Sequence, residues 1–194
     1  MSDAPHRARR TPALVDAPAS ATADAAAAVS IRAIATAARL SLRLSDADAT
    51  AVGVAADFAL AIPLNSSAGS VDCCSARLGP NEWLLIDDKG DTETIAARVE
   101  SVLADRLHAL IDVGHRHVGF AVSGRHARDV LNAGCPLDLA ERAFPSGAAS
   151  RTLLGKAEIV LMRFDRPARY RVECARSFAP YVRDFLQEAA REFR

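Results

Sequence analysis

Aromatic side chains and net charge are both scarce in this sequence. Its 194 residues include one Trp, two Tyr and seven Phe, and 24 basic residues balance 24 acidic ones. A protein that holds nucleic acid needs a positive surface for the phosphates or aromatic platforms for the bases. With half of its residues apolar, the chain has the composition of a globular protein, and we expect it not to bind nucleic acid.

Cysteine is rare as well. The chain has Cys73, Cys74, Cys135 and Cys174, and no two of them form a C-x-x-C pair. Cys73 and Cys74 are adjacent, too close to bridge each other comfortably and poorly placed to share a zinc ion. Because reduced thiols are typical of cytosolic proteins, we interpret all four as free and mostly buried, and we expect a cytoplasmic protein.

Long apolar runs are missing. No stretch approaches the roughly 20 apolar residues of a membrane span, so we expect no membrane segment. The N-terminal region starts with basic residues and continues into an Ala-rich run, but Asp16, Pro18 and Asp24 interrupt it. A signal peptide needs an uninterrupted apolar centre of about 7–15 residues. Residues 1–28 are therefore predicted to be a disordered tail outside the fold.

Motifs that hold phosphates or activate nucleophiles are also missing. The sequence has no G-x-G-x-x-G, no Walker sequence and no G-x-S-x-G elbow. Its expected elements do not alternate as a parallel dinucleotide-binding sheet requires. No pair of carboxylates stands out from charges that would lie in solvent. The sequence therefore predicts no catalytic, cofactor-binding or metal-binding residue in this chain.

Histidines near the middle of the chain are the only candidates for chemistry. His115 and His117 lie two apart on an expected strand, with Asp112 nearby, and this spacing can chelate a metal. Zinc takes three or four ligands, so we favour a surface or interface position for this pair over a metal site. Ser123 with His126 as its base could form a nucleophile, but Ser123 is better explained as the N-cap of a helix over residues 123–134.

Alternating and helical hydrophobic patterns define two similar halves. In the first half we expect a helix capped by Ser45, with Asp48 completing a capping box, and a second helix capped by Asp91. Ile95, Val99, Val102 and Leu103 should form its buried face, and a loop is expected over residues 62–70. The expected strands cover residues 30–34, 39–44, 71–78, 82–86, 108–113, 117–122, 149–154, 156–164 and 169–175. Ser177 should start a final helix whose apolar stripe includes Phe178.

The two halves also share sequence. "LSLRLSDADA" (residues 40–49) matches "VGFAVSGRHA" (118–127), and "LGPNEWLLI" (78–86) nearly recurs as "LGKAEIVLM" (154–162). These matches have almost the same spacing, which is typical of an internal duplication. We predict one α+β domain over residues 29–194, made of pseudo-duplicated strand-strand-helix-strands-helix units over about 29–107 and 108–194.

The stretch "GCPLDLAERAFPSG" (134–147) is an irregular connection. Two prolines fix its backbone, and it carries apolar side chains on a loop. It either packs onto the chain's own core or forms a docking surface for a partner chain. The residues of this candidate partner interface are Cys135, Pro136, Leu137, Leu139 and Phe144.

Six stretches, in this order, resemble the gamma subunit family of heterotetrameric sarcosine oxidase. They are "LGPNEWLLI", "DVGHRHVGFAVSG", "GCPLDL", "RAFPSG", "RTLLGKAEIVL" and "RSFAPYVRDFLQEAAREF", and the likeness runs from about Leu40 to the C-terminus. The resemblance implies a bacterial cytoplasmic complex of alpha, beta, gamma and delta chains. That complex oxidatively demethylates sarcosine to glycine, produces hydrogen peroxide and passes the one-carbon unit to tetrahydrofolate.

The same resemblance implies that this chain is a non-catalytic subunit. FAD, FMN, NAD, zinc and tetrahydrofolate are expected on the other subunits, and the large alpha subunit is the expected main partner, with beta and delta in the same complex. The implied fold is that of the folate-binding domain of aminomethyltransferases, itself a duplicated α+β unit.

One position departs from the folate-binding relatives. In those proteins an Arg-bearing strand and a glycine-rich turn precede a Gly-Phe-Glu strand start, whose Glu hydrogen-bonds the pterin. Here Arg163 matches the arginine, the glycine turn is absent, and Tyr170-Arg171 stands where Phe-Glu would fall. Arginine has no acceptor for the pterin N–H groups, so we expect the folate site to be lost. The alternative is a stand-alone folate-binding one-carbon-transfer protein related to aminomethyltransferase.

Overall fold

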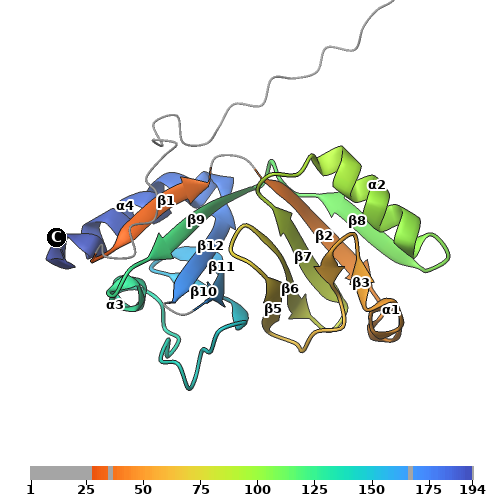
Figure 1. Ribbon diagram of the computed structural model, residues 1–194. Helices are drawn as coiled ribbons and strands as arrows, with labels where there is room; N and C mark the ends of the chain where they lie inside the picture. Colours follow the sequence, from red (N-terminus) through yellow and green to blue (C-terminus); the bar gives the residue numbers. More distant parts are fainter. Residues whose placement is uncertain (1–27, 35–36, 166–167, 194) are drawn as a thin grey trace, which may run out of the picture.

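Two five-stranded antiparallel sheets form the molecule, inclined to each other, and each is covered on its outer side by a helix (Figure 1). The computed structural model describes residues 28–34, 37–165 and 168–193. The predicted tail, residues 1–28, lies outside this part of the chain except for Ala28. The mixed helix and strand content confirms the α+β prediction.

Sheet 1 has the strand order β5-β6-β7-β2-β8, and sheet 2 has the order β1-β9-β12-β11-β10. Sheet 1 is built from β5 (Ser66–Gly69), β6 (Cys73–Gly79), β7 (Glu82–Asp87), β2 (Ala38–Leu44) and β8 (His108–Asp112). Sheet 2 is built from β1 (Ser30–Ile34), β9 (His117–Ser123), β12 (Arg169–Ala175), β11 (Ala157–Phe164) and β10 (Ala149–Leu154). The short strands β3 (Val54–Ala55) and β4 (Phe58–Ala59) form a separate hairpin.

The helices lie against the outer faces of these sheets. The outer face of sheet 1 packs against α2 (Thr92–Leu103), and that of sheet 2 against α4 (Ala179–Ala189) (Figure 1). The shorter helices are α1 (Asp46–Val52) and α3 (Ala127–Asn132), and 3-10 turns η1 (Arg176–Phe178) and η2 (Ala190–Phe193) flank α4. Among the helices of the described residues, none combines the length and apolar composition needed to cross a bilayer.

The two halves of the chain exchange an edge strand. β8 comes from the second half and pairs with β2 in sheet 1, whereas β1 comes from the first half and pairs with β9 in sheet 2. Read from the opposite edge, sheet 2 has the order β10-β11-β12-β9-β1, which repeats β5-β6-β7-β2-β8 position by position. The topology thus has the two-fold repeat that the sequence predicted. The division at residues 107 and 108 stays a prediction.

One of the two sequence matches reflects this repeat and the other does not. Residues 40–49 and 118–127 fall on β2 and β9, which hold the same place in their sheets. Leu78 is the last residue but one of β6, ahead of β7, whereas Leu154 is the last residue of β10, ahead of β11. In the topology β7 corresponds to β12, so "LGPNEWLLI" and "LGKAEIVLM" are similar hairpins at non-equivalent positions. That part of the predicted repeat was wrong.

The predicted helix caps were right in the first half. The Ser45 hydroxyl accepts a hydrogen bond from the Asp48 N–H at 3.1 Å, and the Asp91 carboxylate accepts one from the Thr94 N–H at 2.9 Å. These bonds satisfy N–H groups that a helix start leaves without an intrahelical partner.

Ser123 was predicted as a cap wrongly. It is the last residue of β9, and α3 begins at Ala127 after His126, which makes no side-chain capping bond. Gly124 lies between them at φ +104°, a conformation that favours glycine, so the chain turns there before the helix starts.

The structure corrects three further expectations. Ile95, Val99 and Leu103 are buried as predicted, but Val102 is 46% exposed and lies outside the buried face of α2. Phe178 belongs to η1 and is 40% exposed, so the apolar stripe of α4 starts after it. The loop expected over residues 62–70 contains β5, whose small residues Ser66–Gly69 carry little strand signal.

Candidate functional site

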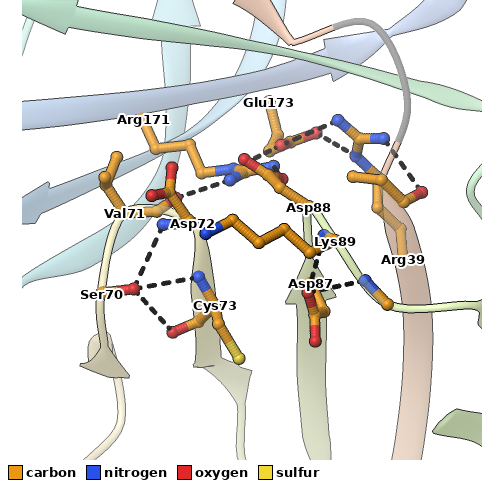
Figure 2. Close-up of polar contacts among 12 residues, drawn as sticks. Arg39, Ser70, Val71, Asp72, Cys73, Asp87, Asp88, Lys89, Arg171 and Glu173 are labelled. Atoms are coloured by element: carbon orange, nitrogen blue, oxygen red, sulfur yellow. Dashed lines mark hydrogen bonds and ion pairs between the residues drawn. The ribbon is translucent and has the colours of Figure 1, made fainter. Parts of the chain in front are cut away.

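Four charged side chains meet between the two sheets. Arg39 comes from β2, Asp88 follows β7, and Arg171 and Glu173 come from β12. Arg39 Nε donates to Glu173 Oε2 at 2.7 Å, Arg171 Nε donates to Glu173 Oε1 at 2.7 Å, and Arg171 Nη2 donates to Asp88 Oδ1 at 2.8 Å. Figure 2 shows Arg171 between the two carboxylates, with Arg39 on the other side of Glu173. We call these four residues the inter-sheet cluster.

Strand alternation puts the charges in this position. Successive side chains of β12 point to opposite faces, so Tyr170, Val172 and Cys174 enter the core under α4, and Arg171 and Glu173 face sheet 1. The sequence of β12 alternates apolar and charged residues, and the strand buries both the apolar and the charged side chains. The charged positions are tolerated because their partners lie on the other sheet.

Gly119 on β9 makes room for the cluster. It lies opposite Glu173 in the strand pairing, and a Cβ at this position would stand 2.5 Å from Glu173 Oε1 and 2.9 Å from Arg39 Nη2. No real Cβ approaches a neighbouring atom so closely. The absence of a side chain at Gly119 is therefore what allows Glu173 and Arg39 to meet.

Charge balance stabilises the cluster despite its burial. Burial opposes ionisation of Glu173, but the Arg171 and Arg39 guanidiniums outweigh it and hold the pKa of this carboxyl below its usual value. Burial likewise opposes the charged form of Arg171, and Glu173 and Asp88 reverse this, so the pKa of Arg171 is raised. Burial raises the pKa of Asp88 in spite of its bond to Arg171. Two guanidiniums thus face two carboxylates.

The folate position predicted from the resemblance is closed by Arg171. All its hydrogen-bonding nitrogens are engaged, since Nη1 donates to the Val71 carbonyl at 2.6 Å in addition to the two carboxylate bonds. The Arg171 side chain is fully buried. Glu173 cannot take over the role of a pterin acceptor, because both of its oxygens accept from arginines. The residues at this position do not fit a pterin.

Arg163 does not contribute to the same place. It lies on β11 with its side chain on the helix-covered face, where Nη1 donates to the Phe144 carbonyl at 2.7 Å and Nη2 pairs with Glu141. Its guanidinium also lies over the Tyr170 ring, 5.8 Å from the centroid. Arg163 therefore anchors the irregular 134–147 stretch and faces away from Arg171.

A groove of about 470 Å³ adjoins the cluster on the inner face of sheet 2. Its lining includes Glu173 and His117, together with Arg151 and Glu158. His117 Nδ1 lies 3.3 Å from the Val113 carbonyl oxygen, and burial lowers the pKa of this imidazole. Since Glu173 is already held by two arginines, it is not placed to exchange protons with a ligand in the groove.

The histidine candidates are not brought together into a site. His115 is exposed, and within the described residues no group of three or more His, Cys, Asp or Glu side chains is arranged to hold a metal. His126 Nδ1 contacts Asp129 Oδ2 at 2.9 Å, and its ring stacks on Phe193 with centroids 4.5 Å apart. His126 is thus a structural contact between α3 and the C-terminal turn.

The candidate partner interface divides between core and surface. Cys135, Leu139 and Phe144 are buried in the core under α4, so their side chains are taken up by the chain itself. Pro136 is exposed and Leu137 is half-buried. The interface therefore stays a prediction for Pro136 and Leu137, the two residues that a partner can reach.

The cysteines agree with the sequence-based interpretation, whereas most of the inter-sheet cluster was not predicted. All four cysteines are free; Cys74, Cys135 and Cys174 are buried and Cys73 is half-buried. Sequence reasoning singled out Arg171 but missed Arg39, Asp88 and Glu173. The signal was available in "ARLSLRL" and "RYRVECA", where single charges interrupt strands that are otherwise apolar.

Comparisons with known proteins agree with this architecture. A family model described as "Sarcosine oxidase, gamma subunit family" matches residues 43–192. The curated protein "Sarcosine oxidase subunit gamma" of Corynebacterium sp. (strain P-1) is 32% identical over 127 residues, which are 65% of this chain. The match spans 61% of that relative's length.

Two solved structures share the fold. One is the heterotetrameric sarcosine oxidase from Corynebacterium sp. U-96 in complex with pyrrole 2-carboxylate, with a TM-score of 0.74 and 24% identity over 85% of each chain. The other is the glycine cleavage system aminomethyltransferase T from Bartonella henselae, with a TM-score of 0.61 and 13% identity over 84% of this chain and 46% of that one. The expected aminomethyltransferase-like fold is confirmed.

Proposed function

The chain belongs to the sarcosine oxidase gamma subunit family, and on that premise we propose that it acts as a non-catalytic subunit of a heterotetrameric sarcosine oxidase. The complex would oxidatively demethylate sarcosine to glycine, with tetrahydrofolate as the one-carbon acceptor and hydrogen peroxide as a product. The gamma chain would stabilise the assembly by covering apolar surface of its partners.

The inter-sheet cluster is the observation that carries the non-catalytic part of this proposal. A general acid or base needs a free lone pair or proton within reach of a substrate. Arg39, Arg171 and Glu173 are buried and bonded to one another, so they are occupied in joining the sheets. This arrangement supports a fold that has kept its shape and filled its former ligand position with a side chain.

Partners and cofactors follow from the same premise. The large alpha subunit would be the main partner, and beta and delta subunits would belong to the same complex. FAD, FMN, NAD, zinc and tetrahydrofolate would be held by those other subunits, in the cytoplasm. Residues 1–28 would form a tail outside the single domain of residues 29–194.

Assembly and flavin content test this function together. The full chain is co-expressed with the alpha, beta and delta chains of its source, and the product is analysed by size-exclusion chromatography, absorbance and sarcosine turnover. We expect all four chains in one yellow, active peak, and a colourless, inactive gamma chain when it is expressed alone. A gamma chain that elutes apart from the other three, or that turns over sarcosine by itself, contradicts the proposal.

A further inference from the structure

Strand β8 is an edge of sheet 1, and among the described residues it pairs with β2 alone. An edge strand presents a row of backbone N–H and C=O groups to which another strand can bind. Its His108 and Leu110 side chains point toward α2, where His108 Nε2 meets Glu100 Oε2 at 2.7 Å. Ala109 and Ile111 alternate with them and therefore point to the opposite face, the inner face of sheet 1.

This inner face is apolar and open at β8. Ile111 is 57% exposed, Leu107 just before the strand is 93% exposed, and Ala109 is exposed as well. Natural edge strands are commonly protected by lysine, proline or a bulge. Residues 107–111 contain neither lysine nor proline, and their pairing with β2 is regular. The acidic residue of β8, Asp112, is its last, so residues 107–111 carry none of these three protections.

The equivalent position in sheet 2 is closed. β1 has the place in sheet 2 that β8 has in sheet 1, and Ile34 lies opposite Gly119 as Ile111 lies opposite Ser41. Gly119 and Ser41 correspond in the match between residues 40–49 and 118–127. Ile34 is only 3% exposed, although it is the same side chain at the same position of the repeat. The fold can bury this isoleucine, and the exposure of Ile111 is specific to the β8 edge.

A positive charge stands beside the apolar row. Arg43, which lies opposite Ala109, contacts the Glu82 carboxylate at 3.2 Å, and Arg151 donates to the same carboxylate at 2.5 and 3.0 Å. Two guanidiniums on one carboxylate leave one positive charge unbalanced. The Arg43 side chain is 58% exposed, so this charge is available to a group approaching along β8.

We propose that an extended segment of a partner subunit docks along β8 as an added strand. Its apolar side chains would cover Leu107, Ala109 and Ile111, and an acidic side chain would pair with Arg43. Backbone hydrogen bonds to an edge strand supply affinity in this mode of recognition, and the side-chain pattern supplies specificity. The inference rests on the proposed function, which provides the partner subunits.

Hydrogen exchange and one pair of variants test the proposal. Amide exchange over residues 107–112 is compared between the free chain and the complex with co-expressed alpha, beta and delta chains. Ile111→Asp is compared with Val102→Asp, which places the same charge on an exposed apolar position of α2, across sheet 1 from the inner face. Circular dichroism checks that both variants are folded.

We expect exchange over residues 107–112 to slow by roughly tenfold or more on assembly. Ile111→Asp should be lost from the complex, and Val102→Asp should assemble as the wild-type chain does. If Ile111→Asp does not fold, the exchange measurement on the wild-type chain decides alone.

Each contrary outcome has a different meaning. A wild-type complex with unchanged exchange at β8 overturns the docking site and leaves the proposed function standing. A wild-type chain that does not copurify with the other three overturns the proposed function and this inference with it. If the chain alone forms a dimer in which β8 is protected, and Ile111→Asp makes it monomeric, the occupant is a second copy and the proposal is wrong.

Discussion

Arg39 and Glu173 are 134 positions apart in the chain, yet the guanidinium of one donates to the carboxylate of the other at 2.7 Å between the two sheets. Each residue belongs to a strand that packs its neighbouring side chains under a different helix. Their contact is therefore made only when both sheets are formed and packed together. The cluster reports on the interface between the sheets more directly than either helix-covered core does.

Neutralising Glu173 should destabilise the fold strongly. Glu173→Gln leaves Arg39 and Arg171 buried without the carboxylate between them, and removal of one member of a buried ion network costs about 3–5 kcal/mol. Glu100→Gln is the matched control, because the Glu100 side chain is about half exposed in its pair with His108 and its neutralisation should change stability by less than about 1 kcal/mol. Urea unfolding measures both. Equal small losses would show that the cluster does not hold the sheets together.

Adding one methyl group at Gly119 should be harmful. Gly119→Ala would push a Cβ into Glu173 and Arg39, and overpacking of this kind costs about 1–3 kcal/mol. Gly79→Ala is the control, since the nearest atom to its Cβ would be 3.2 Å away on the Glu82 side chain. Thermal unfolding should give a lower Tm for Gly119→Ala than for Gly79→Ala. The reverse order would mean that the cluster shifts easily to admit the methyl group.

The pKa values of two histidines should be shifted in opposite directions. Burial lowers the pKa of His117, and the hydrogen bond to the Arg106 carbonyl, followed by Glu100, raises the pKa of His108. NMR titration of the imidazole signals should place His117 below and His108 above the ordinary value of about 6.5. His117→Gln and His108→Gln assign the two signals.

The sign of the stability effect follows from these shifts. A lowered folded pKa means that the unfolded chain takes up the His117 proton first, so this contribution is present above about pH 6.5 and is lost as the pH falls through the folded pKa. The contribution of His108 is present below about pH 6.5 and is lost as the pH rises through its folded pKa. His117→Gln should therefore lose less stability than the wild-type chain on acidification from pH 7.5, and His108→Gln should lose more.

Tetrahydrofolate should not bind the isolated chain. Arg171 and Glu173 use their polar atoms on each other, on Arg39 and on Asp88, so neither side chain offers a free acceptor to a pterin. Isothermal titration calorimetry with tetrahydrofolate should give no saturable heat. Micromolar binding would instead favour a stand-alone folate-dependent protein. A repeat with Glu173→Gln would show whether that binding uses the cluster.

Local patterns predicted most of the elements, because their causes are local. Alternation predicted the strand over residues 39–44, where Leu40, Leu42 and Leu44 form one buried face of β2, and the Ser45 and Asp91 caps fixed the starts of two helices. The miss at Ser123 has a local cause too: a hydroxyl before an apolar run suits a cap, but β9 extends through that residue and Gly124 turns the chain.

The inter-sheet cluster is formed by contacts between residues far apart in the chain, and no local sequence pattern predicts such contacts. Arg171 was found only through resemblance, and nothing in the neighbouring sequence says that Asp88 pairs with it or that Arg39 pairs with Glu173. The exchange of β1 and β8 was missed for the same reason, because strand pairing is set by long-range packing and the two strands look alike in sequence. A charged Glu173 within the otherwise apolar strand "RYRVECA" requires a partner of opposite charge, but only the fold shows which residue this partner is.

The exchanged edge strands have a consequence for biosynthesis. β1 is the first of the described strands to be synthesised, but its partner β9 starts at His117. β1 therefore stays unpaired until β9 has been translated. Sheet 1 meanwhile stays incomplete until β8 has emerged. A chain released before Asp112 would have neither sheet complete, because each half of the chain supplies one strand to the sheet of the other half.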